Sequence, residues 1–204
     1  MNLSDFIEAN AERIVGLAIE FALSQSPPGT NLDPEILRND IPGILQTIVL
    51  DLRSPQTANE QREKSEGRGP VTAHESAATS HGRSRANDGF DVNRMIAEYR
   101  ALRASVLRLW AEDRRLTVDS LDDMIRFNEA IDQAAAESLA EFSRTLESWR
   151  NVFLGALGHD LRGPLNAVVC TADMLLSRTR DTPYERQVER ILSGAEQVGW
   201  LVDG

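Results

Sequence analysis

Residues 135–153, AAESLAEFSRTLESWRNVF, decide the fold that we expect for this chain. Their apolar side chains alternate at spacings of four and three residues, in the series Ala135, Leu139, Phe142, Leu146, Trp149 and Phe153. A seam of this period is typical of a coiled coil, whereas the apolar face of a globular helix is broader. Because such a seam needs a partner helix to cover it, the stretch predicts a long helix and a homodimer.

The helix that contains this seam should be very long. Capping residues at 117–120 precede it, and the chain then has a single proline, Pro164, and no strong stop signal before about Arg178. A continuous helix over this length would measure roughly 90 Å at about 1.5 Å per residue. A turn at 179–183 and an amphipathic segment at 184–202 follow. We therefore expect an antiparallel helical hairpin that forms a four-helix bundle in the dimer.

The preceding part of the chain also has helical periodicity, and no segment alternates apolar and polar residues over the length of a strand. We expect helices at residues 4–24, 72–89 and 91–112, with two short ones between 33 and 52. Residues 54–70, SPQTANEQREKSEGRGP, include no large apolar side chain, so they predict a disordered loop. The sequence therefore predicts an all-α fold.

The composition excludes several classes of protein. The 204 residues carry a net charge of -10 and one cysteine, with a pI near 4.8. No apolar run reaches the ~20 residues that cross a bilayer, so we expect no membrane segment. The acidic balance and the lack of a basic stripe argue against nucleic acid as a partner. No signal peptide or disulfide pair is visible, and the sequence predicts a cytoplasmic protein.

Residues 153–166, FLGALGHDLRGPLN, carry the strongest sign of chemistry. Four apolar residues at helical spacing predict a buried stripe: Leu157, Leu161, Leu165 and Val168. His159 then lies on the opposite, exposed face of the helix. Asp160 beside it could accept the Nδ1–H of the imidazole, which would leave Nε2 as a nucleophile, and could take up the proton released on attack.

The string HDLRGPL, residues 159–165, closely resembles the H-box of sensor histidine kinases, and the resemblance covers about residues 146–204. It implies that His159 is the phosphoacceptor and that Asp160 is the acidic neighbour that acts as general base. Arg162 and Asn166 match flanking polar positions that support phosphate or a docked partner. Gly163 stands where the family often has Thr or Asn to orient a water for dephosphorylation, so phosphatase activity is not implied.

The same resemblance implies partners and cofactors. The partners would be a second copy of the chain, a response regulator receiver domain, and the ATP-binding domain of the same protein, which would bring ATP and Mg²⁺. Within these residues there is no glycine pattern that cradles phosphate and no cluster with metal-ligand spacing. We therefore expect no cofactor and no metal in this chain, and we expect that it stops before the ATP-binding domain.

The rest of the chain resembles a second family. The segments AERIVGLAIEFA (11–22), SHGRSRANDGFDVNRMIAEYRALRASVLRLW (80–110) and IRFNEAIDQAAAES (125–138) are similar to the N-terminal sensor domain of the RsbT co-antagonist proteins of bacterial stress signalling. The match covers about residues 11–143. It implies an all-helical sensory domain without naming a ligand.

Together these features predict three parts: a helical sensor domain at 1–119, its last helix and a coiled-coil signalling helix at 120–150, and a phosphotransfer hairpin at 151–204. The predicted function is the sensory and phosphoacceptor portion of a two-component histidine kinase. The alternative is a non-enzymatic helical scaffold or stress-signalling interaction module in which the box is vestigial.

The other histidines and the cysteine have plainer interpretations. His81 could line a polar signal-binding site together with Arg83, Arg85, Glu98 and Arg100. We favour instead a solvated or locally hydrogen-bonded histidine there, and a surface position for His74. Nothing favours either histidine as a haem ligand. Cys170 is expected to be a small buried hydrophobe.

Overall fold

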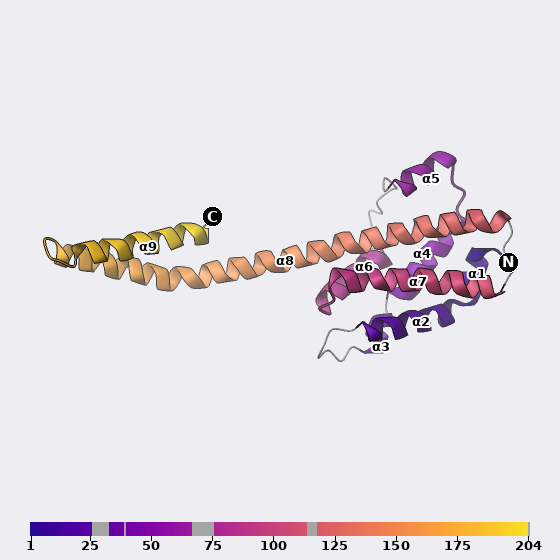
Figure 1. The fold of residues 1–204 in the computed structure, drawn as a ribbon, viewed down its shortest axis with the longest axis horizontal. Helices are drawn as coiled ribbons and strands as arrows, with labels where there is room; N and C mark the ends of the chain where they lie inside the picture. The colour runs from indigo at the N-terminus through magenta and orange to yellow at the C-terminus, as the bar shows by residue number, and fades with distance from the viewer. Residues whose placement is uncertain (26–32, 39, 67–75, 114–117, 204) are drawn as a thin grey trace. The chain divides into compact units, whose positions relative to one another are not determined.

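The computed structural model describes residues 1–25, 33–38, 40–66, 76–113 and 118–203. Over these ranges every regular element is a helix and none is a strand, which confirms the all-α fold (Figure 1). The chain divides into two compact units, Met1–Leu146 and Glu147–Gly204. The helices are α1 (Leu3–Ala9), α2 (Ala11–Ser24), α3 (Pro34–Arg38), α4 (Ile41–Arg53), α5 (Ala58–Ser65), α6 (Ala77–Asn87), α7 (Val92–Asp113), α8 (Val118–Thr179) and α9 (Glu185–Asp203).

The main core of the first unit is shared by α1, α2, α4, α6, α7 and the early turns of α8. The stripe that periodicity predicts on α4 is buried in full: Ile41, Ile44, Leu45, Ile48, Val49 and Leu52. From α8, Phe127 and Ile131 complete this core without any exposed surface. Burial of side chains of this size stabilises a fold by about 1.5–3 kcal/mol each, so the amphipathic pattern decides how these helices pack.

The predicted helix at 4–24 is two helices, because the chain breaks at Asn10. Asn10 caps the end of α1, and its side-chain Nδ2 donates to the carbonyl of Phe6 at 2.9 Å. Asparagine competes in this way with the helical hydrogen bonds of the backbone, which is why it favours helix ends. Leu17 is exposed on α2, although it lies one turn from the buried Ile14.

The prediction of a disordered loop at 54–70 is wrong for the described part of that segment, where α5 forms. Its N-cap, Thr57, makes a reciprocal capping box with Glu60, and the hydrogen bonds from Thr57 hold the pKa of the Glu60 carboxyl below its usual value. Lys64 pairs with Asp51 of α4, and Ser65 donates to Glu129 of α8. Capping and polar contacts therefore stabilise this helix, although it buries no large apolar side chain.

The helix predicted to begin at Thr72 has its start outside the described residues. Within them, α6 begins at Ala77, and the Ser76 side chain caps it by accepting from the backbone N–H of Thr79 at 3.1 Å. A serine therefore caps the described helix.

Helices α6 and α8 lie close together at Gly82, where a Cβ atom would be 2.1 Å from the backbone oxygen of Ser138. Backbone cannot move aside as a flexible side chain can. We expect Gly82→Ala to lower the free energy of unfolding of this unit by about 2 kcal/mol, measured by urea denaturation. The matched control is Gly16→Ala on α2, where nothing lies within 4 Å and the better helix propensity of alanine should leave stability equal or higher. Equal stability of both variants would contradict this packing.

In the second unit, the C-terminal part of α8 and α9 form an antiparallel hairpin (Figure 1). The turn between them includes Asp181, whose φ of 59° lies in the left-handed region that aspartate tolerates. The turn and the second helix were both predicted. Large apolar side chains of this unit stay exposed in the single chain, among them Phe153, Leu157 and Ile191.

The coiled-coil seam is divided between the two units. Phe142 is buried and packs with Phe90 and Met95 in a second core cluster of the first unit. Leu146, Trp149 and Phe153 are exposed on α8. One end of the seam is therefore buried in the core of the first unit, and its other end stays exposed.

Candidate functional site

The candidate site is His159 on α8, in the second unit. Its side chain is 84% exposed and that of Asp160 is 81% exposed, and the imidazole Nδ1 lies 3.2 Å from Asp160 Oδ1. When Nδ1 carries the proton it donates to this carboxylate, and the lone pair then resides on Nε2. The pair that the sequence predicts is thus present, and the imidazole is exposed to solvent.

The surface next to His159 is open. A Cβ atom added at Gly155 or at Gly163 would meet nothing within 4 Å. Both glycines lie one turn from the histidine, on either side of it along the helix. A macromolecule could therefore approach His159 without displacing side chains at these two positions.

Arg162 and Asn166 occupy different places relative to His159. Arg162 is exposed one turn further along α8. Asn166 is two turns away, roughly 10 Å along the helix axis, where it lines a groove between α8 and α9 together with Trp200. The structure therefore keeps Arg162 near the histidine and assigns Asn166 to the hairpin groove.

The apolar stripe behind His159 is not buried by this chain, which corrects our expectation. Leu157, Leu161 and Val168 are 43%, 39% and 44% exposed. Leu165 is half-buried, and its Cδ2 lies 3.5 Å from where a Cβ of Gly199 on α9 would be. A single hairpin covers only one side of α8, so periodicity identified the apolar face correctly but not what covers it.

A second polar cluster, His81, Arg85 and Glu98, lies inside the first unit. His81 and Arg85 come from α6 and Glu98 from α7, with side chains 2%, 0% and 7% exposed. The imidazole Nε2 is 3.0 Å from Glu98 Oε2, and Arg85 Nε donates to both oxygens of Glu98 at 3.1 and 2.9 Å. His81 is therefore neither solvated nor bonded only within its own helix.

The two other residues that we grouped with His81 are elsewhere. Arg83 pairs with Glu141 of α8 at 2.8 Å, and Arg100 is exposed on α7. Sequence reasoning missed Tyr99 and Ser138, which hydrogen-bond each other at 2.6 Å beside the cluster. The sequence did contain a signal for the charged members of this cluster. Arg85 and Glu98 lie at helical spacing from apolar residues of their own helices, which places both on a buried face.

The electrostatics of the cluster follow from burial and pairing. Burial disfavours the charged form of Glu98, but the hydrogen bond from His81 and the charges of His81 and Arg85 outweigh it, so the pKa of Glu98 lies below its usual value. Burial raises the pKa of Asp88, against the opposing charge of Arg85. Arg85 also donates to the carbonyl of Leu37 at 3.1 Å, so the cluster fixes α3, α6 and α7.

We expect Glu98→Gln to lower the free energy of unfolding by about 2 kcal/mol at pH 7, because it removes charge-assisted hydrogen bonds from a buried arginine. A carboxyl whose pKa is lowered on folding stabilises the fold above its unfolded pKa, and this contribution disappears as the pH falls through the folded pKa. The difference between wild type and variant should therefore shrink below about pH 4.3. Urea unfolding at several pH values measures it, and a difference that persisted at pH 2 would contradict the assignment.

Over the part of the chain that the structure describes, no group of three or more His, Cys, Asp or Glu side chains is placed to hold a metal ion. None of the described helices is both long enough and apolar enough to cross a membrane. Cys170 is exposed in the single chain, where we expected a buried residue.

Comparison with known proteins gives a family match. No curated protein and no solved structure matches the chain. The sequence model of one family matches residues 56–152, which comprise α5, α6, α7 and the first half of α8. The match begins later than the residues 11–143 that we expected, so α1 to α4, which complete the core, lie outside it. Residues 56–152 are similar to the N-terminal domain of the RsbT co-antagonist protein rsbRD, which supports a sensor domain of that kind in this chain.

Proposed function

We propose that this chain is the sensory and phosphoacceptor portion of a cytoplasmic two-component sensor histidine kinase. The observation that carries the proposal is the exposed His159 with Asp160 at its Nδ1, on a helix that continues from the sensor unit. The family match supports a signalling module but does not extend to the phosphoacceptor. The H-box resemblance and the geometry of the pair supply that second part of the proposal.

The proposed reaction transfers a phosphoryl group from ATP to His159. The Nε2 lone pair forms the new bond to the γ-phosphorus, and the bond from that phosphorus to the bridging oxygen of ADP breaks. Attack makes the ring cationic, and Asp160 stabilises it and accepts the Nδ1 proton. The products are phosphohistidine, ADP and a proton.

The reaction needs groups from outside the described residues. An ATP-binding domain would hold the nucleotide with Mg²⁺, and a receiver domain of a response regulator would take the phosphoryl group from His159 to its own aspartate. Gly163 has no side chain that could orient a water, so the proposal includes kinase and transfer steps but no phosphatase step.

A second copy of the chain is the proposed cover for the open apolar face of the hairpin. Leu157, Leu161 and Val168 are exposed together on one face of α8, and exposed apolar side chains in such a row favour association. Two hairpins joined through this face would make a four-helix bundle. A change of tilt or register passed along α8 could then alter the access of the ATP-binding domain to His159.

The test is reconstitution. The chain is incubated with radiolabelled ATP, Mg²⁺ and a separately produced histidine kinase ATP-binding domain, and the label on the chain is counted. We expect a phosphate that acid removes and base does not, as a phosphorus–nitrogen bond requires. An absence of label with a domain that phosphorylates its own histidine substrate would contradict the proposal.

The second candidate function is a non-enzymatic helical scaffold or stress-signalling interaction module. The family match favours it, because that match concerns residues 56–152 and stops before His159. A scaffold has no need for an acid beside an exposed histidine. A chain that dimerises and binds partners but never takes up phosphate would support this function instead.

A further inference from the structure

The first unit contains a pocket that neither the phosphotransfer site nor the buried cluster uses. It has a volume of about 160 Å³ and lies between α4, α5, α6 and α8. Its walls are mostly apolar and come from Ile44, Ile48, Ala78, Ala130 and Ala134. A cavity of about 150 Å³ with apolar walls holds a molecule the size of benzene, so the pocket fits a body of roughly six to eight non-hydrogen atoms.

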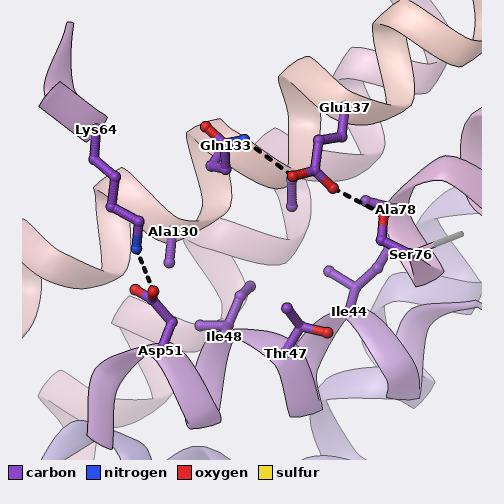
Figure 2. A pocket seen from close by; sticks show the side chains of 11 residues that line it. Ile44, Thr47, Ile48, Asp51, Lys64, Ser76, Ala78, Ala130, Gln133 and Glu137 are labelled. Carbon is purple, nitrogen blue, oxygen red and sulfur yellow. Dashed lines mark hydrogen bonds and ion pairs between the residues drawn. The ribbon is translucent and has the colours of Figure 1, made fainter. Parts of the chain in front are cut away.

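Charged side chains stand at two ends of this pocket, as Figure 2 shows. At one end Lys64 of α5 reaches Asp51 of α4, and this ion pair balances its own charge. At the other end Glu137 of α8 accepts from the Ser76 hydroxyl at 2.8 Å and from the Gln133 amide at 2.9 Å. The opposite charges therefore cancel at one end of the pocket. At the other end, the Glu137 carboxylate is held only by uncharged hydrogen-bond donors among the described residues.

The environment of Glu137 indicates what would bind. Within the described residues, both hydrogen bonds that its oxygens accept come from uncharged groups, so its negative charge is oriented but not balanced there. Asp51, Lys64 and Glu137 together give the lining a net charge of -1. A cation with hydrogen-bond donors is the group that such a carboxylate recognises best, and the net charge of -10 of the whole chain adds to that preference.

We propose that this pocket binds a small primary amine whose apolar body fills the space between α4 and α8 and whose ammonium group pairs with Glu137. Apolar walls with a few placed polar groups are the usual design of a small-molecule site. Its role as the signal site of a kinase rests on the proposed function, whereas the binding itself does not involve His159. Failure of binding would therefore leave the phosphoacceptor proposal untouched.

Benzylamine and benzyl alcohol are the probes, because they share one shape and differ in charge. Calorimetric titration of the full chain at pH 7 should give saturable binding of benzylamine with a Kd of about 1 mM, and binding of benzyl alcohol at least tenfold weaker. Glu137→Gln keeps the size of the side chain and should weaken benzylamine about tenfold while leaving benzyl alcohol within about twofold. The matched control is Glu147→Gln, an exposed position on the same helix, which should change neither.

A third variant tests the apolar end. Ala134→Leu fills the pocket and should abolish binding of both probes, with circular dichroism to verify the fold. Methyl NMR of the wild-type chain locates the bound probe without a substitution. Benzylamine in the pocket should shift the methyl signals of Ala130 and Ala134. Absence of saturable benzylamine binding, equal affinity for the two probes, or unshifted alanine signals would each overturn the proposal.

Discussion

The His159→Gln variant is expected to take up no phosphoryl group when it is incubated with ATP, Mg²⁺ and a histidine kinase ATP-binding domain. Glutamine can hydrogen-bond but has no ring nitrogen whose lone pair can attack phosphorus. The side chain is 84% exposed, so the substitution should leave the fold unchanged, which far-UV circular dichroism can verify. The label on the protein after a fixed time is the measurement.

The control for this variant is the same substitution at another histidine, His74→Gln, which should be labelled like the wild type. Label that persists on His159→Gln would show that another residue accepts the phosphoryl group. Label lost equally from both variants would show that the substitution acts in some other way. Either result would contradict the assignment of His159.

The Asp160→Asn variant is expected to be phosphorylated about a thousandfold more slowly than wild type. Asparagine can still accept a hydrogen bond from Nδ1, but it carries no charge to stabilise the cationic ring and cannot take up a proton. Catalysis by a positioned acid or base contributes about 10²- to 10⁴-fold, which sets the size of the effect. Initial rates of labelling at saturating ATP measure it.

Asp173→Asn is the matched control, because Asp173 is an exposed aspartate on the same helix, several turns beyond the histidine. Its rate should equal that of the wild type. A rate for Asp160→Asn within about threefold of wild type would show that the carboxylate has no chemical role. The 3.2 Å approach of Asp160 to Nδ1 would then be only a consequence of their adjacency in the sequence.

The elements that the sequence predicted best are those that burial determines. The α4 stripe, the hairpin and the long α8 follow from apolar spacing, and a helix that must bury one face has little freedom in how it packs. The same spacing indicated an apolar face at Leu157 and Leu161, but it could not tell whether α9 or another surface covers that face. Periodicity describes one helix, whereas burial depends on its neighbours.

The elements that the sequence predicted poorly depend on single polar residues. Helix α5 has no apolar face, so a test for apolar periodicity could not find it, although the Thr57 and Glu60 capping box was visible in the sequence. The break at Asn10 depends on one side-chain hydrogen bond. Local polar contacts of this kind compete with apolar periodicity in setting where a helix begins and ends.

The candidate sites differ in the same way. His159 and Asp160 are adjacent in the sequence, so their pairing needed no knowledge of the fold. His81 and Glu98 lie on different helices and meet only when α6 packs on α7, as do the α4 and α8 residues that line the amine pocket. The sequence shows which residue types are present, but it could not show that residues from different helices meet in one site.

The central claim, that Nε2 of His159 is the atom that accepts the phosphoryl group, can be tested directly by ³¹P NMR of the labelled chain with mass-spectrometric mapping of the modified residue. Because Nδ1 faces Asp160, we predict a phosphorus resonance typical of Nε2-phosphohistidine, on His159, that is lost in acid and kept in base. A phosphate ester on serine or threonine, or phosphorus bonded to Nδ1, would contradict the account.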